Sequence, residues 1–519
     1  MSIPVIDIFA GPGGLGEGFS SLLDNGRRVF KTILSIEMDK YAHETLTLRS
    51  FFRQFEPNKA PKEYYEFMKG NLSLNKLFES YPEEAEKAKQ EAWKAKLGYD
   101  KKSVKPEEVD KRIRGALKGI GNWVLLGGPP CQAYSIVGRS RNQKTILDAN
   151  EDERVDLYKQ YLRILAMHNP AVFVMENVKG MLSARSTESP VFEKVHNDLS
   201  DPVKFSDDIS DEVKKGLNCP GYKIYSLIKP VEDYDQEGNP VFSAKDFIIR
   251  CEDYGIPQTR HRVILLGIRK DIDTKPIILK QTSKVSLSQV VDDLPKLRSG
   301  LSREEDNYNN WHRNIANITS NGAMIDMDEK VIQEIKKTIK KLKKAQNGVG
   351  RKFVKYHGNS NSKPYRADWF LDENLDGVSN HISKSHMGSD LHRYLFSSAY
   401  AVTYDSSAKL EDFPSSLLPE HKNVNEALKT KKFADRFRVQ LKDEPAKTIT
   451  SHISKDGHYY IHYDPTQCRS LTVREAARIQ TFPDNYFFCG PKTSQYIQVG
   501  NAVPPLLARK IAEIVLKLF

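Results

Sequence analysis

Short runs of apolar and β-branched residues alternate with longer stretches of helical spacing over the first third of the chain. Runs of this length, bounded by glycine, proline or polar residues, are typical of strands. Strands that alternate with helices indicate βαβ units, and therefore a parallel sheet. The predicted strands are Val5–Phe9, Val29–Ile36, Trp123–Leu126 and Ala171–Met175.

The alternation of strands and helices resumes far along the chain. Another apolar run, Arg262–Ile268, follows a turn-rich YGIPQ segment and predicts a further strand. The chain closes on LLARKIAEIVLKLF, whose apolar residues recur at helical spacing. The sheet domain is therefore expected to use both ends of the chain, residues 1–275 and about 465–519.

Three segments interrupt the alternation. Residues 79–119 are rich in Glu, Lys and Ala without the apolar density of a core, so we expect an exposed helical excursion. Residues 183–245 carry an acidic stretch and a turn-like DQEGNP, which indicates a second insertion made of peripheral loops. Residues from about 276 to 464 mix basic helix, aromatics, Ser, Asn and His, which predicts a separate, smaller domain.

Composition and charge narrow the class of protein. Of 519 residues, 39% are hydrophobic and 28% charged, with no apolar run long enough to cross a bilayer, so we expect a soluble protein without membrane contact. The start, MSIPVIDIFAGPGG, lacks a secretory leader, which favours a cytoplasmic or nucleoid location. The formal net charge of +11 suits a polyanionic partner, but also many soluble proteins.

The cysteines and histidines indicate neither disulfides nor a metal. No C-x-x-C pair occurs, which fits a reduced compartment. The histidine spacings match no common zinc pattern, so we expect no metal site. The five cysteines are Cys131, Cys219, Cys251, Cys468 and Cys489.

A glycine-rich turn follows the first predicted strand. Asp7-Ile8-Phe9-Ala10-Gly11-Pro12-Gly13-Gly14 leads into a helix, and glycines at such a turn let the backbone approach a ligand. The second strand ends in Glu37 and Met38, where α/β folds place a carboxylate that binds ribose hydroxyls. Together, the glycine-rich turn and this carboxylate predict a nucleoside cofactor. Glycine-rich sequences of this kind also form ordinary tight turns.

A cysteine stands beyond the third predicted strand. In Gly127-Gly128-Pro129-Pro130-Cys131 the prolines hold the loop and the glycines clear space at the strand end, where open α/β sheets bind ligands. A rigidly held thiol at that place is a candidate nucleophile. The alternative, a small buried structural cysteine, is the more common role of a lone Cys.

Two further polar motifs flank apolar strands. Glu176 ends the run Phe173–Glu176, where a carboxylate needs a catalytic role, a cap or an ion partner. Arg260 and Arg262 precede the Arg262–Ile268 strand, and alternation would direct both to one side. Two arginines on one side are suited to bind an anion or a polarised carbonyl. The alternative is that they form ordinary salt bridges.

Taken in this order, the motifs resemble those of the DNA cytosine-5 methyltransferases. FAGPGG resembles their S-adenosylmethionine loop, GGPPCQAYS their nucleophile loop, MENV their catalytic glutamate and QTRHR their paired arginines. RSLTVREAARIQTFPD and QVGNAVPP complete the set. The resemblance implies an α/β, doubly wound, Rossmann-like methyltransferase core, with residues 276–464 as a mixed target-recognition domain that reads double-stranded DNA.

The resemblance also implies a mechanism and site residues. The Cys131 thiolate would add to carbon 6 of a flipped-out cytosine and so activate carbon 5, with Glu176, Arg260 and Arg262 stabilising the base. The base that removes the carbon 5 proton is not identified. Implied cofactor contacts are Asp7, Phe9, Gly11, Gly13, Gly14, Glu37, Met38, Asn71, Pro130, Asn501 and Val503. Implied DNA contacts are Gln132, Ser135 and Arg139.

Several features depart from the family or stay open. The acid expected to bind the adenine amino group is replaced by Asn71 in a Gly-Asn pair. A predicted helix over Val331–Leu342 carries lysines on its remaining faces, which suits either DNA phosphates or a solvated surface. The Tyr- and His-rich run Gly457–Tyr463 is expected to form a strand.

Two rival functions remain at this point: a cytosine-5 methyltransferase acting on RNA, and a DNA-binding protein whose methyltransferase fold has lost its activity. The family resemblance further implies that the enzyme acts beside a restriction or other defence nuclease encoded nearby. We expect a monomer, although the sequence does not determine the oligomeric state. The recognition sequence and the roles of the two insertions do not follow from the sequence.

Overall fold

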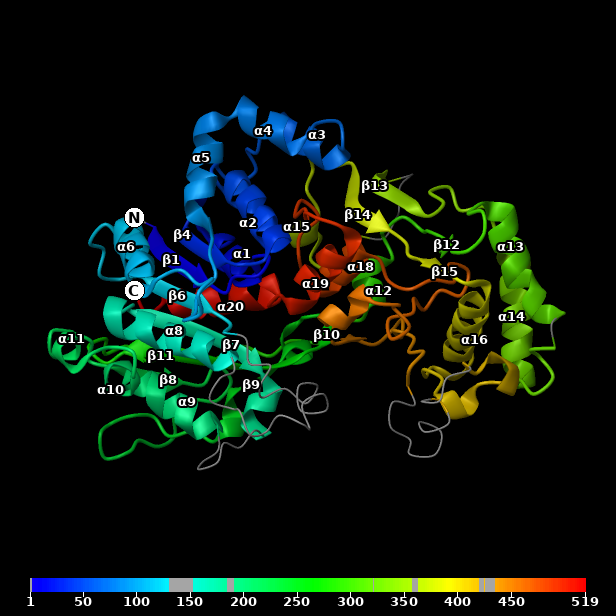
Figure 1. Cartoon of the computed structure of the whole chain (residues 1–519). Coiled ribbons are helices and arrows are strands. Elements are labelled where there is room, and N and C mark those ends of the chain that lie inside the picture. Colours follow the sequence, from blue (N-terminus) through cyan, green and yellow to red (C-terminus); the bar gives the residue numbers. More distant parts are fainter. Residues whose placement is uncertain are drawn as a thin grey trace. The chain divides into compact units, whose positions relative to one another are not determined.

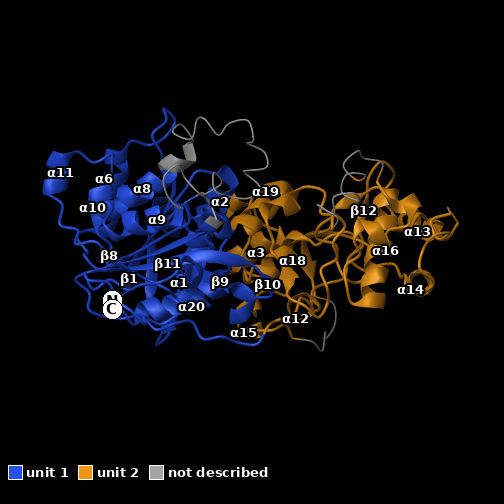
Figure 2. Ribbon diagram, turned by 90° about the horizontal axis from the view of Figure 1, so that it is seen from below, with its two compact units in different colours: residues 1–61, 78–283, 502–519 blue, residues 62–77, 284–501 orange. Residues whose placement is uncertain are grey.

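The chain forms two compact units, which are coloured separately in Figure 2. The computed structural model describes residues 2–129, 153–183, 191–320, 322–356, 363–419, 424 and 435–519. Unit 1 comprises residues 1–61, 78–283 and 502–519, and unit 2 comprises residues 62–77 and 284–501. The boundaries lie near residues 283 and 501, whereas the sequence pattern placed them near 275 and 464.

Unit 1 is built on an eight-stranded sheet of order β5-β4-β1-β6-β7-β11-β8, with β9 paired to β11 (Figure 1). The strands from β5 to β7 run parallel, and β11 is antiparallel to each of its neighbours. The strands are β1 (Ile3–Ile8), β4 (Phe30–Glu37), β5 (Ala92–Lys94), β6 (Val124–Gly127), β7 (Val172–Val178), β8 (Tyr222–Tyr225), β9 (Ile248–Arg250) and β11 (His261–Arg269).

The five strands expected from apolar runs are confirmed as β1, β4, β6, β7 and β11. Their side chains are buried because helices cover both faces of the sheet, so continuous apolar runs replace the alternation of a half-exposed strand. In Figure 2 the sheet lies between α1 and α20 on one side and α6, α8 and α9 on the other. These helices are α1 (Gly14–Ser20), α6 (Pro106–Leu117), α8 (Glu153–His168), α9 (Val191–Ser200) and α20 (Pro505–Leu516).

The expectation of an exposed excursion over residues 79–119 is wrong. The segment is helical in α5 (Pro82–Glu91) and α6, but between them β5 extends the sheet beside β4. Val109 and Ile113 of α6 are fully buried in the core. Composition misled the prediction because a few apolar residues, spaced one helical turn apart, are enough to cover a sheet edge.

The expectation of peripheral loops over residues 183–245 is also wrong in part. Helix α9 packs Phe192, Val195 and Leu199 into the core, and β8 is a strand of the main sheet. The stretch after β8 is irregular, with an isolated bridge between Tyr234 and Pro240 across the DQEGNP turn. Smaller elements nearby are α10 (Pro202–Phe205) and α11 (Asp211–Lys215).

The two ends of the chain meet in unit 1, as expected from the helical spacing of the last residues. The N- and C-termini lie side by side in Figures 1 and 2, and helix α20 packs against α1. Helix α2 packs against both β4 and β5. The remaining elements of unit 1 are β2 (Leu23–Asp24), β3 (Arg27–Arg28), α2 (Lys40–Arg53) and β10 (Gln258–Thr259).

A buried ion-pair network joins three helices of unit 1. Arg49 of α2 donates from Nε to Oε2 of Glu17 in α1 at 2.8 Å, and Arg53 donates to Glu91 of α5 at 2.7 Å. All four side chains are less than a tenth exposed. Because buried charges are stable only when they are paired, this network holds α1, α2 and α5 together next to the glycine-rich turn that leads into α1.

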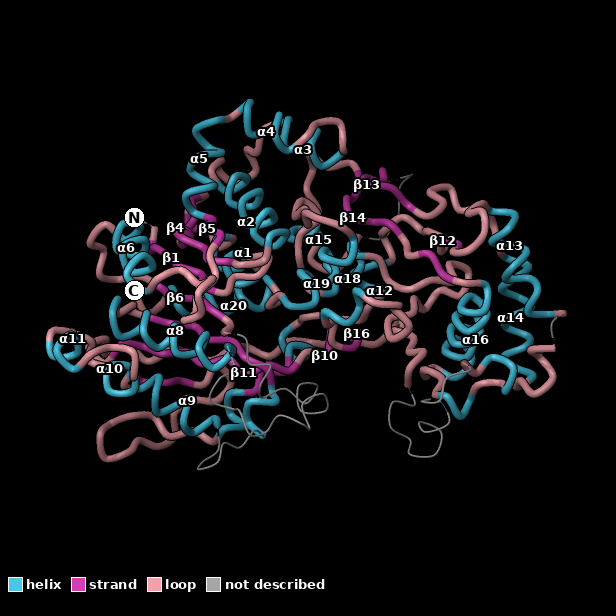
Figure 3. The backbone as a smooth tube through the Cα atoms, in the orientation of Figure 1, coloured by secondary structure: helices cyan, strands magenta, loops and turns pink. Residues whose placement is uncertain are grey.

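Unit 2 consists mainly of helices and loops, with short two-stranded sheets (Figure 3). The helix expected over Val331–Leu342 is confirmed as α14 (Glu329–Lys341), whose N-terminus is capped by Asp328. Other helices are α3 (Lys62–Lys69), α12 (Ser288–Val291), α13 (Tyr308–Ala316), α15 (Ala367–Phe370), α16 (Gly388–Tyr404), α18 (Val473–Ile479) and α19 (Lys492–Asn501), while α4 (Leu74–Ser80) spans the boundary. The strands are β12 (Gly300–Leu301), β13 (Gly350–Lys355), β14 (Gly377–Ile382), β15 (Ser385–His386) and β16 (Ala446–Lys447).

The strand expected over Gly457–Tyr463 is absent. These residues form a turn, in which Tyr460 N–H donates to the Gly457 carbonyl, and only Ile461 makes isolated bridges, to Val439 and Ser470. Gly457 adopts φ +83°, a left-handed conformation that ends strand geometry. Alternation of Tyr and His was therefore a poor guide here.

The motif RSLTVREAARIQTFPD forms the centre of unit 2. Thr472 and Glu475 make a capping box at the start of α18, and Arg469 donates to the Glu475 carboxylate at 2.7 Å. One turn further, Arg478 is held between Asp293 and Asp484. These arginines are fully buried, and each is paired with an acidic residue inside unit 2.

Among the residues that the structure describes, none of the helices has both the length and the apolar content needed to cross a membrane.

Candidate active site

Four strand ends of unit 1 meet at one edge of the sheet. In the register of the parallel strands, Ile8 pairs with Ile36 and with Gly127, and Gly127 pairs with Met175. The residues that follow these positions therefore reach the same level, at the carboxyl ends where open α/β sheets bind ligands. They are Phe9, Glu37, Gly128 and Glu176.

The glycine-rich turn is shaped by positive φ angles and tied to β4. Phe9, Gly11 and Gly13 have φ angles of 56°, 57° and 92°. Glu37 accepts the Gly11 N–H at 2.8 Å through Oε2 and the Asp39 N–H at 2.7 Å through Oε1. Burial raises the pKa of Glu37, and these backbone donors oppose that rise. The acid at the end of β4 thus holds the loop in its ligand-ready shape.

Asp7 lies beneath this turn and is fully buried. Its Oδ2 accepts the Gly16 N–H at 3.2 Å, while Oδ1 has no hydrogen-bond partner among the described residues. Burial raises the pKa of Asp7 to about 7, and the Gly16 hydrogen bond and the charge of Arg53 only partly oppose this. A carboxyl with one unpartnered oxygen below the predicted cofactor loop is poised between its charged and neutral forms.

The glycines serve two different purposes. A Cβ on Gly11 would meet nothing within 4 Å, so this residue borders open space, as a ligand-facing glycine should. A Cβ on Gly14 would lie 2.2 Å from the Val503 carbonyl, and one on Gly18 would lie 2.4 Å from Ala508 Cβ. Gly14 and Gly18 therefore allow the C-terminal segment to cross α1 closely.

The other predicted cofactor contacts divide between the units. Met38 belongs to unit 1 and is 55% exposed, which leaves an apolar side chain beside the glycine-rich turn. Asn71 and Asn501 belong to unit 2 and are both exposed. Asn71 donates from Nδ2 to Glu66 at 2.8 Å, which orients its amide.

The nucleoside part of a cofactor fits these residues of unit 1. An open glycine at Gly11 gives backbone access, Glu37 supplies a carboxylate at the adjacent strand end, and Met38 offers an apolar surface. This is the donor and surface set that α/β folds present to adenosine. No phosphate-binding lysine accompanies the turn, which disfavours a nucleoside triphosphate.

The second half of the edge brings Glu176 and Arg262 together. Arg262 Nε lies 2.9 Å from Glu176 Oε1, although the N–H is not aligned for a hydrogen bond, so the contact is an ion pair. Both side chains are about one-seventh exposed, which leaves the pair open to a ligand. The antiparallel direction of β11 brings its first residues to the carboxyl end of β7 and creates this contact.

The segment that leads to the predicted nucleophile runs directly past Glu176. A Cβ on Gly128 would lie 3.1 Å from Glu176 Oε2, and Asn177 Nδ2 lies 3.4 Å from the Pro129 carbonyl that it donates to. Cys131 follows Pro129 by two residues. The residues predicted from this loop, Pro130, Cys131, Gln132, Ser135 and Arg139, lie outside the described residues.

Arg260 and Arg262 occupy different environments. Arg260 is 1% exposed and precedes β11, whereas Arg262 is accessible beside Glu176. The positive charges of both guanidiniums lower the pKa of Cys251, a buried thiol that the sequence analysis did not single out as a site residue. Burial nevertheless raises the pKa of Cys251 to about 12, so this thiol stays protonated and unreactive.

His261 and Glu252 were also missed by the sequence analysis. His261 Nε2 lies 2.8 Å from Glu252 Oε1, which ties the QTRHR segment to the turn after β9. Their closeness in sequence was visible, but neither residue type nor spacing distinguished them from surface charges.

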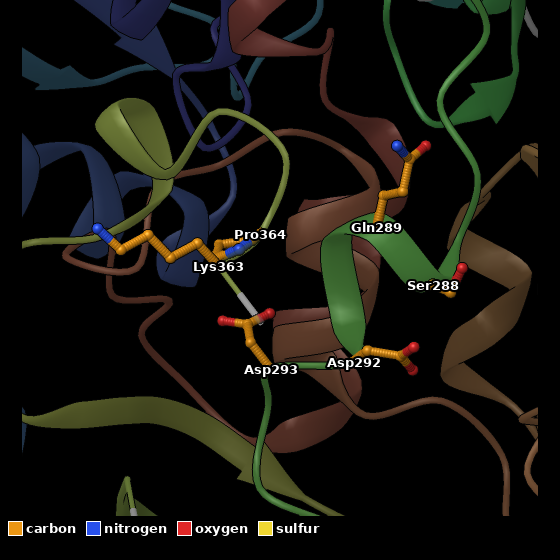
Figure 4. Close-up of a pocket in the computed structure, with 6 residues that line it drawn as sticks. All are labelled: Ser288, Gln289, Asp292, Asp293, Lys363 and Pro364. Carbon is orange, nitrogen blue, oxygen red and sulfur yellow. The ribbon is translucent and has the colours of Figure 1, made fainter. Parts of the chain in front are cut away.

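A separate hollow in unit 2 contains none of the predicted site residues (Figure 4). Its acids are already engaged: Asp292 accepts from Tyr463 and Asp293 pairs with Arg478. The hollow is therefore better explained by packing than by catalysis. It is lined by Ser288, Gln289, Asp292, Asp293, Lys363 and Pro364.

Comparison with known proteins identifies the family. The sequence model of the C-5 cytosine-specific DNA methylases matches residues 80–202 and 231–517. The type II methyltransferase M.Bpa9945I of Bacillus paralicheniformis is 32% identical, over 98% of this chain and 98% of its own. The DNA (cytosine-5-)-methyltransferase M.ApeKI of Aeropyrum pernix is 27% identical, over 78% of this chain and 83% of its own.

Among solved structures, one described as a DNA modification methyltransferase encoded within a prophage in E. coli has the same fold. It superimposes with a TM-score of 0.51 at 17% identity, over 100% of this chain and 99% of that one. The chain belongs to the C-5 cytosine-specific DNA methylase family. It is a DNA (cytosine-5-)-methyltransferase with the doubly wound α/β core expected from its motifs.

Proposed function

We propose that this enzyme methylates carbon 5 of a cytosine rotated out of a specific double-stranded DNA sequence, through a covalent adduct with Cys131. The observation that carries the proposal is the Glu176–Arg262 ion pair at the strand edge, with the Gly128–Pro129 segment running past it toward Cys131. When bound at the glycine-rich turn, S-adenosylmethionine would supply the methyl group from its sulfonium sulfur, which would leave as a neutral thioether.

The roles of the side chains follow from electron flow in the pyrimidine. The Cys131 thiolate forms a bond from sulfur to carbon 6, and the displaced electron pair gives carbon 5 the nucleophilicity to take a methyl group. Glu176 holds or protonates the N3 edge, where negative charge develops, and Arg262 orients Glu176 and stabilises the base oxygen. Loss of the carbon 5 proton to water then returns the electron pair and breaks the bond from sulfur to carbon 6.

The remaining assignments belong to the same proposal. In unit 1, Phe9, Gly11, Gly13, Glu37 and Met38 contact the cofactor, and buried Asp7 supports the turn from beneath, while Gly14 packs against Val503. Pro130, Asn71 and Asn501 are kept as cofactor contacts on the family resemblance alone. Arg260, which is 1% exposed, stabilises the loop beside the reacting base, while Gln132, Ser135 and Arg139 contact DNA. Unit 2 reads the target sequence, and the enzyme acts as a monomer beside a restriction or defence nuclease that cuts the unmodified sequence. Base rotation is required because a stacked base cannot present carbon 6 to a thiolate.

The test combines methylation mapping with trapping of the adduct. A mixed-sequence duplex library and labelled S-adenosylmethionine should yield 5-methylcytosine at one short motif for the wild type and the Cys251→Ser control, and none for Cys131→Ser. A duplex with 5-fluorocytosine at that motif should remain attached to Cys131, because fluorine cannot leave carbon 5 as a proton does.

Three outcomes would contradict the proposal. Methylation by Cys131→Ser at the wild-type rate would remove the covalent step. Transfer to structured RNA in place of duplex DNA would favour an RNA enzyme. Tight DNA binding by the wild type without any transfer would indicate a binding protein that has lost its activity.

A further inference from the structure

Nearly all of the net positive charge of the chain lies in one short segment of unit 2. Residues 336–355 contain nine basic and no acidic residues, against a formal net charge of +11 for the chain, so the other residues carry only +2 together. We call these nine residues the basic strip: Lys336, Lys337, Lys340, Lys341, Lys343, Lys344, Arg351, Lys352 and Lys355.

The fold exposes every member of the basic strip. Helix α14 buries Val331, Ile332, Ile335 and Thr338 and packs against α16, so its lysines lie on the surfaces that remain. The loop after α14 leads into β13, whose Arg351, Lys352 and Lys355 are likewise exposed. In Figure 1 the chain runs from α14 through this loop into β13, and residues 345–350 in the loop carry no charge.

Little of this charge is neutralised within the protein. Lys337 pairs with Glu334 at 2.7 Å, and Lys355 lies 3.6 Å from Asp376. For the other seven members, the described part of the chain shows no ion pair. Favourable interaction with the C-terminal dipole of α14 concerns only its last turn, Lys340 and Lys341, and leaves Arg351 and Lys352 unexplained.

We infer that the basic strip binds the phosphate backbone of double-stranded DNA without reading its sequence. The inference rests on the proposed function, in which unit 2 engages a DNA duplex. Eight of the nine members are lysines, whose ammonium is a point charge on a flexible stem and attracts phosphate without demanding one geometry, in contrast to the planar fork of arginine. Lys336 and Lys340 are about 6 Å apart along the helix axis, as are Lys337 and Lys341, so one face follows a backbone over several nucleotides.

The test measures how DNA affinity depends on salt. The variant Lys336→Gln/Lys340→Gln/Lys341→Gln removes three unpaired charges while keeping good helix formers. The matched control, Lys101→Gln/Lys102→Gln/Lys111→Gln, removes the same charge from exposed positions of unit 1. Binding of a mixed-sequence 30-base-pair duplex is followed by fluorescence anisotropy over a salt series, with circular dichroism to verify helix content.

The strip variant should show a log–log salt slope about 2.7 less steep than the wild type, since each lost phosphate contact removes about 0.9. Between 1 M and 0.1 M salt, the affinity of the wild type should therefore rise about 500-fold more than that of the strip variant, while the methylated motif stays unchanged. The control should behave as the wild type, and a triple Lys→Arg variant should restore the slope.

An unchanged slope, or an equal loss in the control, would overturn the inference. So would a variant that loses binding to RNA or to anionic vesicles while its DNA binding stays intact. Binding requires no turnover, so a slope change in a protein that fails to methylate DNA would support the basic strip and refute the proposed chemistry separately.

Discussion

The buried carboxyl of Asp7 makes the stability of unit 1 depend on pH in an unusual direction. Burial raises the pKa of Asp7 from 3.8 to about 7, assisted by the charge of Glu37 and opposed by the Gly16 hydrogen bond and by Arg53. Because the folded state binds the proton more tightly than the unfolded chain, the stability contributed by this group is complete below about pH 4. It is lost as the pH rises through about 7.

The magnitude follows from the shift in pKa. Raising the pH from 5 to 8 removes about 2 to 3 kcal/mol of folding stability through Asp7 alone, given about 1.4 kcal/mol per pKa unit. An Asp7→Asn substitution keeps the oxygen that accepts the Gly16 N–H and abolishes the titration. The variant should therefore gain about 2 to 3 kcal/mol relative to the wild type between pH 5 and pH 8.

Chemical denaturation of both proteins at a series of pH values measures this difference, because titrations shared by the two proteins cancel. Asp24→Asn, at an exposed residue of β2, controls for the change of one charge. An Asp7→Asn curve parallel to the wild type over pH 5–8 would refute the reasoning, as would a loss of stability on raising the pH that is larger in the variant.

Four further substitutions test the packing and the site. Glu17→Gln removes the carboxylate charge that faces the buried Arg49 guanidinium and should cost about 3–5 kcal/mol in denaturant unfolding; a loss below about 1 kcal/mol would contradict the buried network. Gly18→Ala pushes α1 away from α20 and should lower the free energy of unfolding by about 1–3 kcal/mol. Gly115→Ala, whose Cβ would meet open space in α6, should raise it by up to about 1 kcal/mol. Equal shifts in melting temperature for the two variants would contradict the close packing at Gly18. Glu176→Gln should lower kcat by about 10²- to 10⁴-fold with DNA affinity retained, measured by methyl transfer and anisotropy, and a parallel loss of affinity would instead indicate a structural role of its ion pair with Arg262.

The amino-acid sequence alone predicted five strands of the central sheet and the class of reaction. Apolar runs such as Val5–Phe9 and Ala171–Met175 are strong local signals, because a strand buried on both faces must be apolar throughout. Pro-Pro-Cys, Glu-Asn-Val and the paired arginines are equally local, since each carries its chemistry within a few residues. From them, the family and the reaction class were both predicted.

Long-range packing decided what those local signals could not. Residues 79–119 look like solvated helix in composition, yet β5 completes an edge of the sheet and Ile113 is buried beneath it. Gly14 looks like a ligand-binding glycine, but the Val503 carbonyl, nearly 500 residues away in sequence, occupies the space beside it. Only the tertiary structure brings such segments together.

The active-site pairing shows the same division. The sequence identified Glu176 and Arg262 separately, as an acidic residue at the end of one strand and a basic residue at the start of another. Their ion pair exists because β11 runs antiparallel to β7, and strand direction is set by chain connectivity and sheet assembly. The pKa of Asp7 likewise comes from burial beneath other elements, and therefore the sequence determined which groups are present while the fold decided which of them are charged.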